Sequence, residues 1–314
     1  MKPSVSVVIP LYNKAEYVHR SLDSIARQIF QDFEVIVVND GSTDGGERIV
    51  SSYPDDRFRL VSQPNAGPGA ARNRGIAEAR ADWIAFLDAD DEWTPEFLSE
   101  SLCVAGKYPG NVSAVASSYI EYPSGISSEP LWRRRGICDG LFRLTPQTAP
   151  LLAVHHLAFM SPWSTIVRSD VLRRWGGFFE ERCLYAEDAF LFLQILLNEP
   201  VAFQLKPLVR FHTEASGLSN NFVRRSPVEP FLQYPERVEA NCPMPLRQLL
   251  AHILAIRAFK RACVLGYWGQ WREALALRKR FAVPGAWRLP YYGPSLLAAT
   301  PFAGPLGGAL RKFK

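Results

Sequence analysis

The N-terminal part of the chain alternates between short β-branched runs and longer stretches in which apolar residues recur at helical spacing. Residues 5–9 form a run of β-branched residues interrupted only by Ser6, and residues 15–30 then repeat apolar side chains every three or four positions. Such runs are typical of buried strands, and such spacing is typical of amphipathic helices. The same succession predicts strands at 33–38, 58–62 and 83–87 and helices at 43–53 and 68–79. This alternation predicts an α/β fold with a mostly parallel sheet flanked by helices.

The middle of the chain continues the pattern less regularly. We expect helices at 94–106, 169–175 and 187–198, and strands at 112–122, 164–167 and 201–211. The strand at 112–122 is expected near the sheet edge, and residues 123–150 are expected to form a loop. Beyond Met244, two amphipathic helices are predicted at 246–267 and 270–281, so the tail differs in kind from the front of the chain.

Polar residues cluster where the predicted strands end. The clusters are Tyr12-Asn13, Asn39-Asp40, Asn65 and Asp88-Ala89-Asp90-Asp91. Sheets of this kind bind ligands in the crevice at the carboxyl ends of their strands. We therefore expect the four clusters to line one ligand site.

Asp88 and Asp90 are the most specific chemical signal among these clusters. Two carboxylates one residue apart at a strand end repel each other unless a cation or hydrogen-bond donors compensate them. A hard divalent ion, Mg²⁺ or Mn²⁺, is the natural partner, and it keeps open positions for substrate phosphates. The alternative is a turn that caps the next helix, with Asp91 or Thr94 as the N-cap residue.

The other clusters supply groups that suit a nucleotide. A flat base can stack on Tyr12, the Asp40 carboxylate can accept a hydrogen bond from a ring N–H, and Arg72 can donate to carbonyl or phosphate oxygens. Each of these groups supplies what a nucleotide needs, beside a candidate metal site at the Asp88–Asp90 pair.

Seven short motifs now carry a resemblance to a known family. They are PLYN, NDGSTD, NAGPGAARNRGI, WIAFLDADD, the GGF turn, AED and RFHTEASGLS. In this order the chain resembles a family 2 glycosyltransferase with the GT-A nucleotide-diphospho-sugar fold, over about residues 4–220. One departure is Asn39, where many relatives have Asp, but the following Asp40 is present.

The resemblance implies an inverting, metal-dependent enzyme with assigned site residues. Its nucleotide-sugar-binding residues would be Pro10, Tyr12, Asn13, Asp40, Asn65, Arg72, Asp88 and Ala89. Asp90 would bind Mg²⁺ or Mn²⁺, and His212 matches a histidine that in some relatives touches the metal or diphosphate. A histidine at a strand end can equally be hydrogen-bonded without any ligand role, so both interpretations stay open.

Asp188 matches the general base of the family. It also lies near a predicted helix start, where a carboxylate is stabilised by the helix dipole in the absence of any catalytic role. Glu187 would orient the acceptor or Asp188, and Trp163 falls in a segment that lines the acceptor pocket of relatives, although a buried aromatic fits it as well.

Other enzyme classes fit less well. A dehydrogenase needs GxGxxG after the first strand, whereas Gly67-Pro68-Gly69 follows the third. An aspartyl-phosphate phosphatase needs Thr or Ser after the acids, where Glu92-Trp93 stands, and a nucleotidyltransferase needs a Gly-rich loop that is absent near Ile9. The alternative that stays open is an inactive relative that binds nucleotide sugar as a scaffold or regulatory module.

Composition and charge sharpen the picture of the tail. The chain is 47% hydrophobic and 21% charged, which excludes disorder for most of its length. Its net charge of +5 divides at Met244 into 24 Lys and Arg against 30 Asp and Glu, then 12 against 1. The five cysteines form no CxxC pair, so neither a disulfide framework nor a zinc site is indicated, and a reducing cytoplasm fits best.

The tail also contains a segment without charge at 289–310. Its length suits a membrane span, but four prolines and four glycines should break a regular helix. An interfacial segment on an anionic membrane and a segment packed on protein both stay open.

These observations give one overall prediction. Residues 1–243 should form the GT-A domain, with a nucleotide-sugar half at 1–110 and an acceptor half at 111–243, followed by a helical extension at 244–314. We expect a cytoplasmic enzyme, peripheral to the membrane if the tail binds it, that moves sugar from a UDP-linked donor to a saccharide or lipid-linked acceptor in polysaccharide synthesis. No nucleic acid partner is expected, and self-association stays open.

Overall fold

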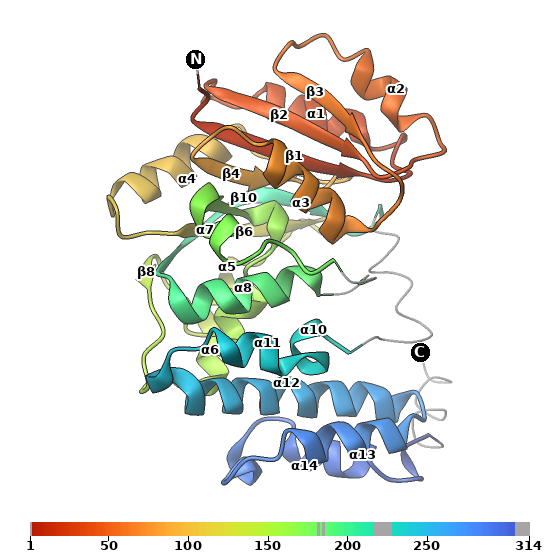
Figure 1. Ribbon diagram of the computed structural model, residues 1–314, viewed down its shortest axis with the longest axis vertical. Helices are drawn as coiled ribbons and strands as arrows, with labels where there is room; N and C mark the ends of the chain where they lie inside the picture. Colours follow the sequence, from red (N-terminus) through yellow and green to blue (C-terminus); the bar gives the residue numbers. More distant parts are fainter. Residues whose placement is uncertain (1, 181–182, 184–185, 216–227, 305–314) are drawn as a thin grey trace. The chain divides into compact units, whose positions relative to one another are not determined.

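A computed structural model describes residues 2–180, 183, 186–215 and 228–304 of the chain (Figure 1). The fold consists of two compact units, each described here by itself. The first comprises Met1–Arg143 and Leu157–Gly217, and the second comprises Leu144–His156 and Leu218–Lys314. The domain boundary expected at 243/244 stays a prediction.

The first unit is built on one mixed sheet whose N-terminal half is parallel. Its parallel strands are β1 (Val5–Leu11), β2 (Phe33–Asn39), β3 (Phe58–Ser62) and β4 (Trp83–Phe86), in the spatial order β3-β2-β1-β4. The helices that connect them are α1 (Val18–Ala26), α2 (Gly46–Ser51) and α3 (Pro68–Glu78). Every residue of β2 is buried, as the apolar run predicts for a strand covered on both faces.

The sheet continues beyond β4 with strands from the middle of the chain. They are β9 (Thr165–Arg168), β6 (Ala114–Tyr122), β10 (Val201–His212) and β5 (Glu92–Trp93), in that spatial order. The expected edge position of β6 is wrong, because β6 lies between β9 and β10. Its two central serines suit the interior since they are buried and hydrogen-bonded: Gln204 Nε2 donates to Ser117 Oγ at 2.8 Å, and Ser118 Oγ donates to the Leu205 carbonyl at 2.6 Å.

The segment expected as a loop at 123–150 is more regular than predicted. It contains β7 (Ile126–Ser127), α5 (Glu129–Arg134), β8 (Gly140–Phe142) and the start of α6 (Pro150–Ala158). Pro130 lies in the first turn of α5, where a missing N–H costs nothing, and Trp132 is fully buried with its ring 4.8 Å from that of Phe159. A single buried tryptophan therefore orders a helix too short to give a periodic pattern. The remaining helices of this unit are α4 (Phe97–Gly106), α7 (Ser169–Arg174) and α8 (Glu187–Asn198).

A close approach of α3 to β1 positions the side chains of α3 over the sheet. A Cβ atom added to Gly75 would lie 2.2 Å from Cγ1 of Val8, so only glycine permits this spacing. The helix begins at Pro68, directly after the strand-end residues of β3, and it is held down along its length. Arg72 on this helix is buried as a result.

The second unit is helical. Its helices are α10 (Pro230–Gln233), α11 (Pro235–Ala240), α12 (Arg247–Tyr267), α13 (Trp271–Arg280) and α14 (Tyr292–Ala298). The buried Glu229 carboxylate accepts hydrogen bonds from Arg257 at 3.1 Å and Arg261 at 3.0 Å, which fixes the chain before α10 against α12. The two expected tail helices are thus present as α12 and α13.

Helix α14 lies in the uncharged segment, where prolines were expected to prevent any regular helix. It is short, and Pro294 falls in its first turn, where its ring and missing N–H are tolerated. It packs closely on α12, since a Cβ atom on Gly266 would lie 2.4 Å from the carbonyl oxygen of Ala298. Within the described ranges, no helix combines the length and hydropathy that crossing a bilayer requires.

Candidate active site

The carboxyl ends of β1 and β2 are joined by side-chain contacts. Asn13 has a positive φ of 49°, and its Oδ1 accepts a hydrogen bond from the Thr43 backbone N–H at 2.8 Å. Tyr12 is 48% exposed, so its ring is available to a ligand, whereas Pro10 lies within β1 and is partly buried. The two strand ends predicted to meet do so.

Asp40 organises the loop that follows β3. Its buried carboxylate accepts hydrogen bonds from Gln63 Nε2 at 2.7 Å and from the backbone N–H groups of Ala66 and Gly67, both at 2.9 Å. Asn65, in the same loop, is exposed. A carboxylate offers roughly four acceptor positions, so one remains for the ring N–H that Asp40 is predicted to bind.

Arg72 joins two distant parts of the chain. Its guanidinium donates to Asp88 Oδ1 at 2.7 Å and to Glu187 Oε1 at 2.8 Å. Burial opposes the positive charge, but the two carboxylates outweigh this effect and raise the pKa of Arg72. Its Nε is buried and makes no hydrogen bond with any described residue. The end of β4 and the start of α8 are therefore held together through one cation.

Asp188 is placed by the first turn of α8. The preceding Ala186 has a positive φ of 59°, and Asp188 Oδ1 accepts a hydrogen bond from the Ala189 backbone N–H at 2.7 Å. Burial and the neighbouring Glu187 carboxylate raise the pKa of Asp188 to about 7, although the Arg72 charge acts in the opposite direction. A carboxyl group with this pKa can take up a proton near neutral pH, which an ordinary aspartate does poorly.

Asp90 and Asp91 are buried after β4 with incomplete compensation. Lys14 Nζ donates to Asp90 Oδ2 at 2.5 Å and also to the Ala215 carbonyl. Burial, followed by the charge of Asp88, raises the pKa of Asp90, and burial with both neighbouring aspartates raises that of Asp91 well above its usual range. Burial and mutual repulsion therefore disfavour the charged forms of these two carboxyl groups.

His212 ends β10 beside these carboxylates. Its backbone N–H donates to Asp91 Oδ1 at 2.8 Å, and its Nδ1 lies 2.9 Å from Glu214 Oε1. Nε2 is buried and lies 3.2 Å from Glu92 Oε1, but it makes no hydrogen bond among the described residues. The motif that begins at Arg210 continues past residue 215, and residues 216–219 of it lie outside the described ranges.

The donor atoms at this strand end suit a divalent ion in part. Asp90 is a hard oxygen donor that already pairs with Lys14, and His212 Nε2 is a buried nitrogen that makes no hydrogen bond within the described ranges. In the part of the chain that is described, however, no three His, Cys, Asp or Glu side chains are grouped as a ready metal site. An ion that takes one or two carboxylates plus substrate phosphates needs no such group, so the residues fit an ion that arrives with a diphosphate.

Two predicted site residues belong to the core instead of an open surface. Ala89 is 2% exposed, and Trp163 is stacked on Phe211 with ring centroids 5.1 Å apart. The Trp163 carbonyl accepts a hydrogen bond from Trp93 Nε1 at 2.8 Å. The acceptor role of Trp163 stays a prediction, but its contacts are those of a packed aromatic.

Sequence reasoning missed two residues that shape the site. Lys14 supplies the cation at Asp90, and Asn73 exchanges two hydrogen bonds with the backbone of Phe178, at 2.7 and 2.8 Å. A Cβ atom on Gly177 would lie 2.3 Å from Asn73 Oδ1, so the GGF turn depends on glycine to fit against α3. Asn73 stands inside the NAGPGAARNRGI motif, next to Arg72, and Lys14 directly follows the PLYN motif. Their closeness to these motifs was the available signal.

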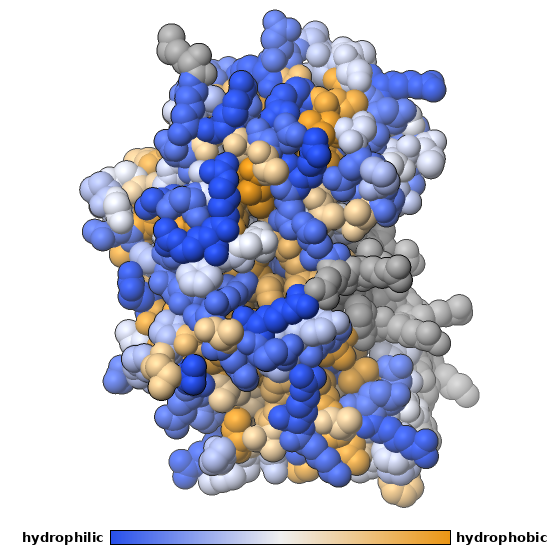
Figure 2. Space-filling model, viewed as in Figure 1, coloured by the Kyte–Doolittle hydropathy of each residue, from blue (hydrophilic) through white to orange (hydrophobic). Residues whose placement is uncertain are grey.

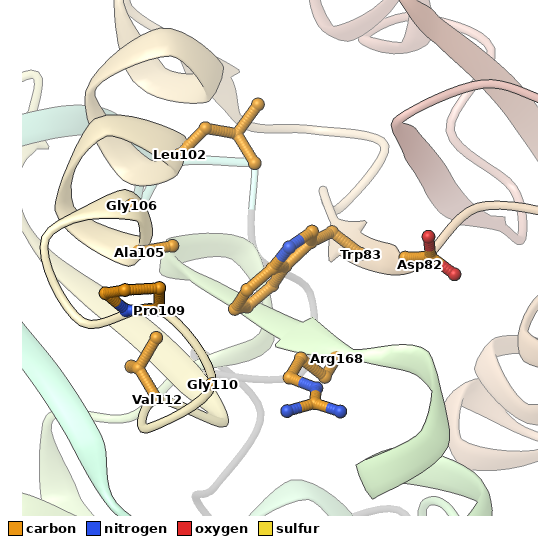
Figure 3. A pocket seen from close by; sticks show the side chains of 9 residues that line it. All are labelled: Asp82, Trp83, Leu102, Ala105, Gly106, Pro109, Gly110, Val112 and Arg168. Atoms are coloured by element: carbon orange, nitrogen blue, oxygen red, sulfur yellow. The ribbon is translucent and has the colours of Figure 1, made fainter.

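A separate pocket lies at the opposite end of β4 (Figure 3). It is lined by Trp83, Leu102, Pro109, Val112 and Arg168, among others, with Asp82 at its rim. None of the predicted site residues lines it. The predicted site residues therefore lie at the carboxyl end of the strand and not in this pocket.

Comparison with known proteins bears directly on the motifs at these strand ends. The model of the family described as "Glycosyl transferase family 2" matches residues 6–173, more than half of the chain. The chain belongs to glycosyl transferase family 2. The matched range contains the clusters at the ends of β1, β2, β3 and β4, and it stops before Asp188 and His212.

Three bacterial glycosyltransferases are among the relatives of this chain. EpsJ of Bacillus subtilis, an uncharacterized glycosyltransferase, is 42% identical over 60% of this chain and 55% of its own length. Glycosyltransferase GlyA of Streptococcus pneumoniae is 38% identical over 79% of this chain and 36% of its own. The putative glycosyltransferase EpsH of B. subtilis is matched over 31% of its length, so the chain aligns with about a third to a half of these relatives.

Solved structures resemble the fold more completely. TarS 1–349 of S. aureus, crystallised with UDP-GlcNAc, has a TM-score of 0.74 at 19% identity, covering 99% of this chain and 92% of TarS 1–349. The mannosyltransferase PcManGT of Pyrobaculum calidifontis, in complex with GDP-Man and Mn²⁺, has a TM-score of 0.58 at 19% identity, covering 99% and 88%. The predicted GT-A fold is thereby confirmed.

Proposed function

We propose that the chain is an inverting glycosyltransferase that uses a UDP-linked sugar and a saccharide or lipid-linked acceptor in the synthesis of a surface polysaccharide. The observation that carries this proposal is that Arg72 donates hydrogen bonds to Asp88 at 2.7 Å and to Glu187 at 2.8 Å. Glu187 is the neighbour of Asp188 in the chain. This arrangement puts a candidate base from α8 beside the nucleotide-binding strand ends. Family membership and the likeness to TarS, which was crystallised with UDP-GlcNAc, support the donor class.

Asp188 is the proposed general base. Its carboxylate takes the proton of an acceptor hydroxyl, the hydroxyl oxygen attacks the anomeric carbon, and the bond from that carbon to the diphosphate oxygen breaks. The bonding electrons leave with the diphosphate, and the configuration at the anomeric carbon inverts. Glu187 keeps Arg72 and the start of α8 in place, and its charge helps to raise the pKa of Asp188.

The donor would lie along the strand ends. Tyr12 is exposed enough to stack on the base. Asp40, Asn65, Asn13 and Pro10 would surround that position, and Asp88 would reach the ribose, whereas the side chain of Ala89 is buried. Asp90, with His212 as a second candidate, would hold Mg²⁺ or Mn²⁺. Such an ion would neutralise the developing charge on the leaving diphosphate.

A catalytically inactive nucleotide-sugar-binding module is the second candidate. The retention of Asp188 with a pKa of about 7 favours the enzyme, since a binding module has no need for a base poised near neutrality. Slow release of UDP from UDP-GlcNAc, with water as acceptor, separates the two candidates without knowledge of the natural acceptor.

A panel of nucleotide sugars tests the donor class. UDP-GlcNAc, UDP-glucose, UDP-galactose and GDP-mannose are added to the protein with Mn²⁺ or with EDTA, and thermal unfolding is followed. We expect stabilisation by UDP-sugars with Mn²⁺, of about 2.7 kcal/mol at a hundredfold excess over Kd. Asp90→Ala should remove the Mn²⁺-dependent part, whereas Asp82→Ala, an exposed aspartate before the same strand, should keep it. Failure of every nucleotide sugar to stabilise the protein contradicts the proposal.

A further inference from the structure

The C-terminal helices expose an unusual concentration of large apolar side chains. Eleven large hydrophobic residues are exposed in the described part of the chain, and five of them lie between 287 and 302. We call these five the apolar patch: Trp287 (67% exposed), Tyr291 (42%), Leu296 (48%), Leu297 (71%) and Phe302 (74%). Single exposed apolar residues are ordinary, but a cluster marks an interaction surface.

Helix α14 contributes to the patch because it is apolar on both faces. Its inner face, with Ser295 and Ala298, is buried, and Ala298 fits against Gly266 of α12. Leu296 and Leu297 point away from that contact and are exposed. Since no charged residue occurs from 289 to 310, the outer face lacks the polar groups that a solvent-facing helix carries. Packing within this unit therefore buries only one of the two apolar faces of α14.

Basic residues accompany the patch, and one of them, Arg280, lies 4.0 Å from the Glu236 carboxylate. No Asp or Glu follows Glu273 in the sequence, while Lys279, Arg280 and Arg288 are exposed. The Arg288 guanidinium lies 4.7 Å from the centroid of the Trp287 ring, so positive charge adjoins the apolar side chains directly. A second copy of this surface would bring like charges together, which disfavours self-association through it.

We propose that the apolar patch binds the surface of an anionic lipid bilayer. Tryptophan and tyrosine are enriched at the level of lipid headgroups, leucine and phenylalanine reach the acyl boundary, and lysine and arginine pair with anionic headgroups. The patch has each of these in one short segment. All of these residues lie in the second unit, so the inference goes beyond the transfer reaction and does not depend on it.

Flotation with vesicles tests the inference on the full chain. The probes are vesicles of phosphatidylcholine alone and vesicles in which part of it is replaced by phosphatidylglycerol. We expect flotation with the anionic vesicles at low salt, and at least about tenfold weaker binding to neutral vesicles or at high salt. Leu297→Glu and Phe302→Glu should each weaken binding by about tenfold or more, because a charge replaces buried acyl contact.

Matched controls come from the first unit. Ile29 (64% exposed) and Ile126 (63%) are as exposed as Leu297, so Ile29→Glu and Ile126→Glu should float like the wild type. Leu297→Ser, which adds no charge, should give an intermediate loss and guards against misfolding of the glutamate variant, with circular dichroism as the check. The inference is overturned if the wild type stays unbound to anionic vesicles, or if the control variants lose as much binding as Leu297→Glu. It is also overturned if Leu297→Glu instead splits an oligomer seen by light scattering.

Discussion

The strand ends of the first unit and the C-terminal helices of the second differ in the groups that they leave without a suitable partner. The strand ends bury carboxyl groups, whereas the C-terminal helices expose apolar side chains. At the strand ends, burial raises the pKa of Asp90, Asp91 and Asp188, so the charged forms of these carboxyl groups are disfavoured in the absence of a cation. In the second unit, Arg288 and Lys279 are exposed, and apolar side chains such as Leu297 are left uncovered. Figure 2 shows hydrophobic residues at the surface of the C-terminal helices.

This difference teaches what each region is prepared to bind. Buried carboxylates that repel one another favour a ligand that brings positive charge, as a divalent ion with a diphosphate does. An uncovered apolar face with a basic border favours a ligand that is apolar and anionic, as a lipid surface is. Buried charged groups and exposed apolar side chains thus indicate which kind of ligand each region can bind.

The largest expected effect concerns the cation that completes the strand-end network. Arg72→Ala leaves Asp88 and Glu187 without their shared partner, and removing one member of a buried ionic network costs about 3–5 kcal/mol of unfolding free energy. Urea unfolding measures the loss. Arg74→Ala, on the same helix, removes only an exposed pair with Glu78 and should cost about 1 kcal/mol or less. An equal decrease in unfolding free energy in the two variants would show that burial does not determine how much these ion pairs stabilise the fold.

The next effect tests whether the second unit stands apart. Gly266→Ala places a Cβ atom 2.4 Å from the Ala298 carbonyl oxygen and should destabilise α14 by about 1–3 kcal/mol, measured by thermal unfolding. Gly293→Ala, with no atom within 4 Å of the added Cβ, should be neutral or slightly stabilising. Neither variant should change donor binding, and a loss of donor affinity in Gly266→Ala would break the proposed separation of the two regions.

A smaller effect concerns the pH dependence of turnover. Protonated Asp188 cannot act as a base, so activity should rise with pH and level off above about pH 7. Glu187→Gln removes the second contribution to that raised pKa and should move the rising limb to lower pH, while the amide oxygen still accepts from Arg72. Profiles of kcat/KM against pH measure the shift, and Glu78→Gln is the control. An unmoved limb would contradict the assignment of Asp188.

The same pKa also has a consequence for stability. The folded state retains a proton on Asp188 that the unfolded chain, with an ordinary aspartate pKa of 3.8, has already released. Between these values the folded state binds more protons, so the contribution of this group to stability falls as pH rises toward about 7. This carboxyl group therefore weakens the fold in the state in which it would act as a base.

Prediction from the sequence succeeded for strands and helices that are long enough to show a regular spacing of apolar residues. The parallel strands lie within one or two residues of their predicted bounds. The buried strands β1 and β2 show why, because their runs of β-branched residues are typical of strands covered on both faces. It failed at α5 and α14, which are too short for a periodic pattern and are held by tertiary contacts, among them those of Trp132 and Ala298. It also missed Lys14, because its pairing with Asp90 joins residues far apart in the chain and no local rule gives that contact.

Asp188→Asn tests the central claim most directly. The exposed Asp82→Asn serves as its control. UDP release from UDP-GlcNAc and donor affinity are measured on the same preparations. We expect turnover to fall by about 10²–10⁴-fold in Asp188→Asn, with donor affinity unchanged, because a general base contributes to that extent and takes no part in holding the nucleotide. Turnover in Asp188→Asn equal to that of the wild type and of Asp82→Asn would contradict the account.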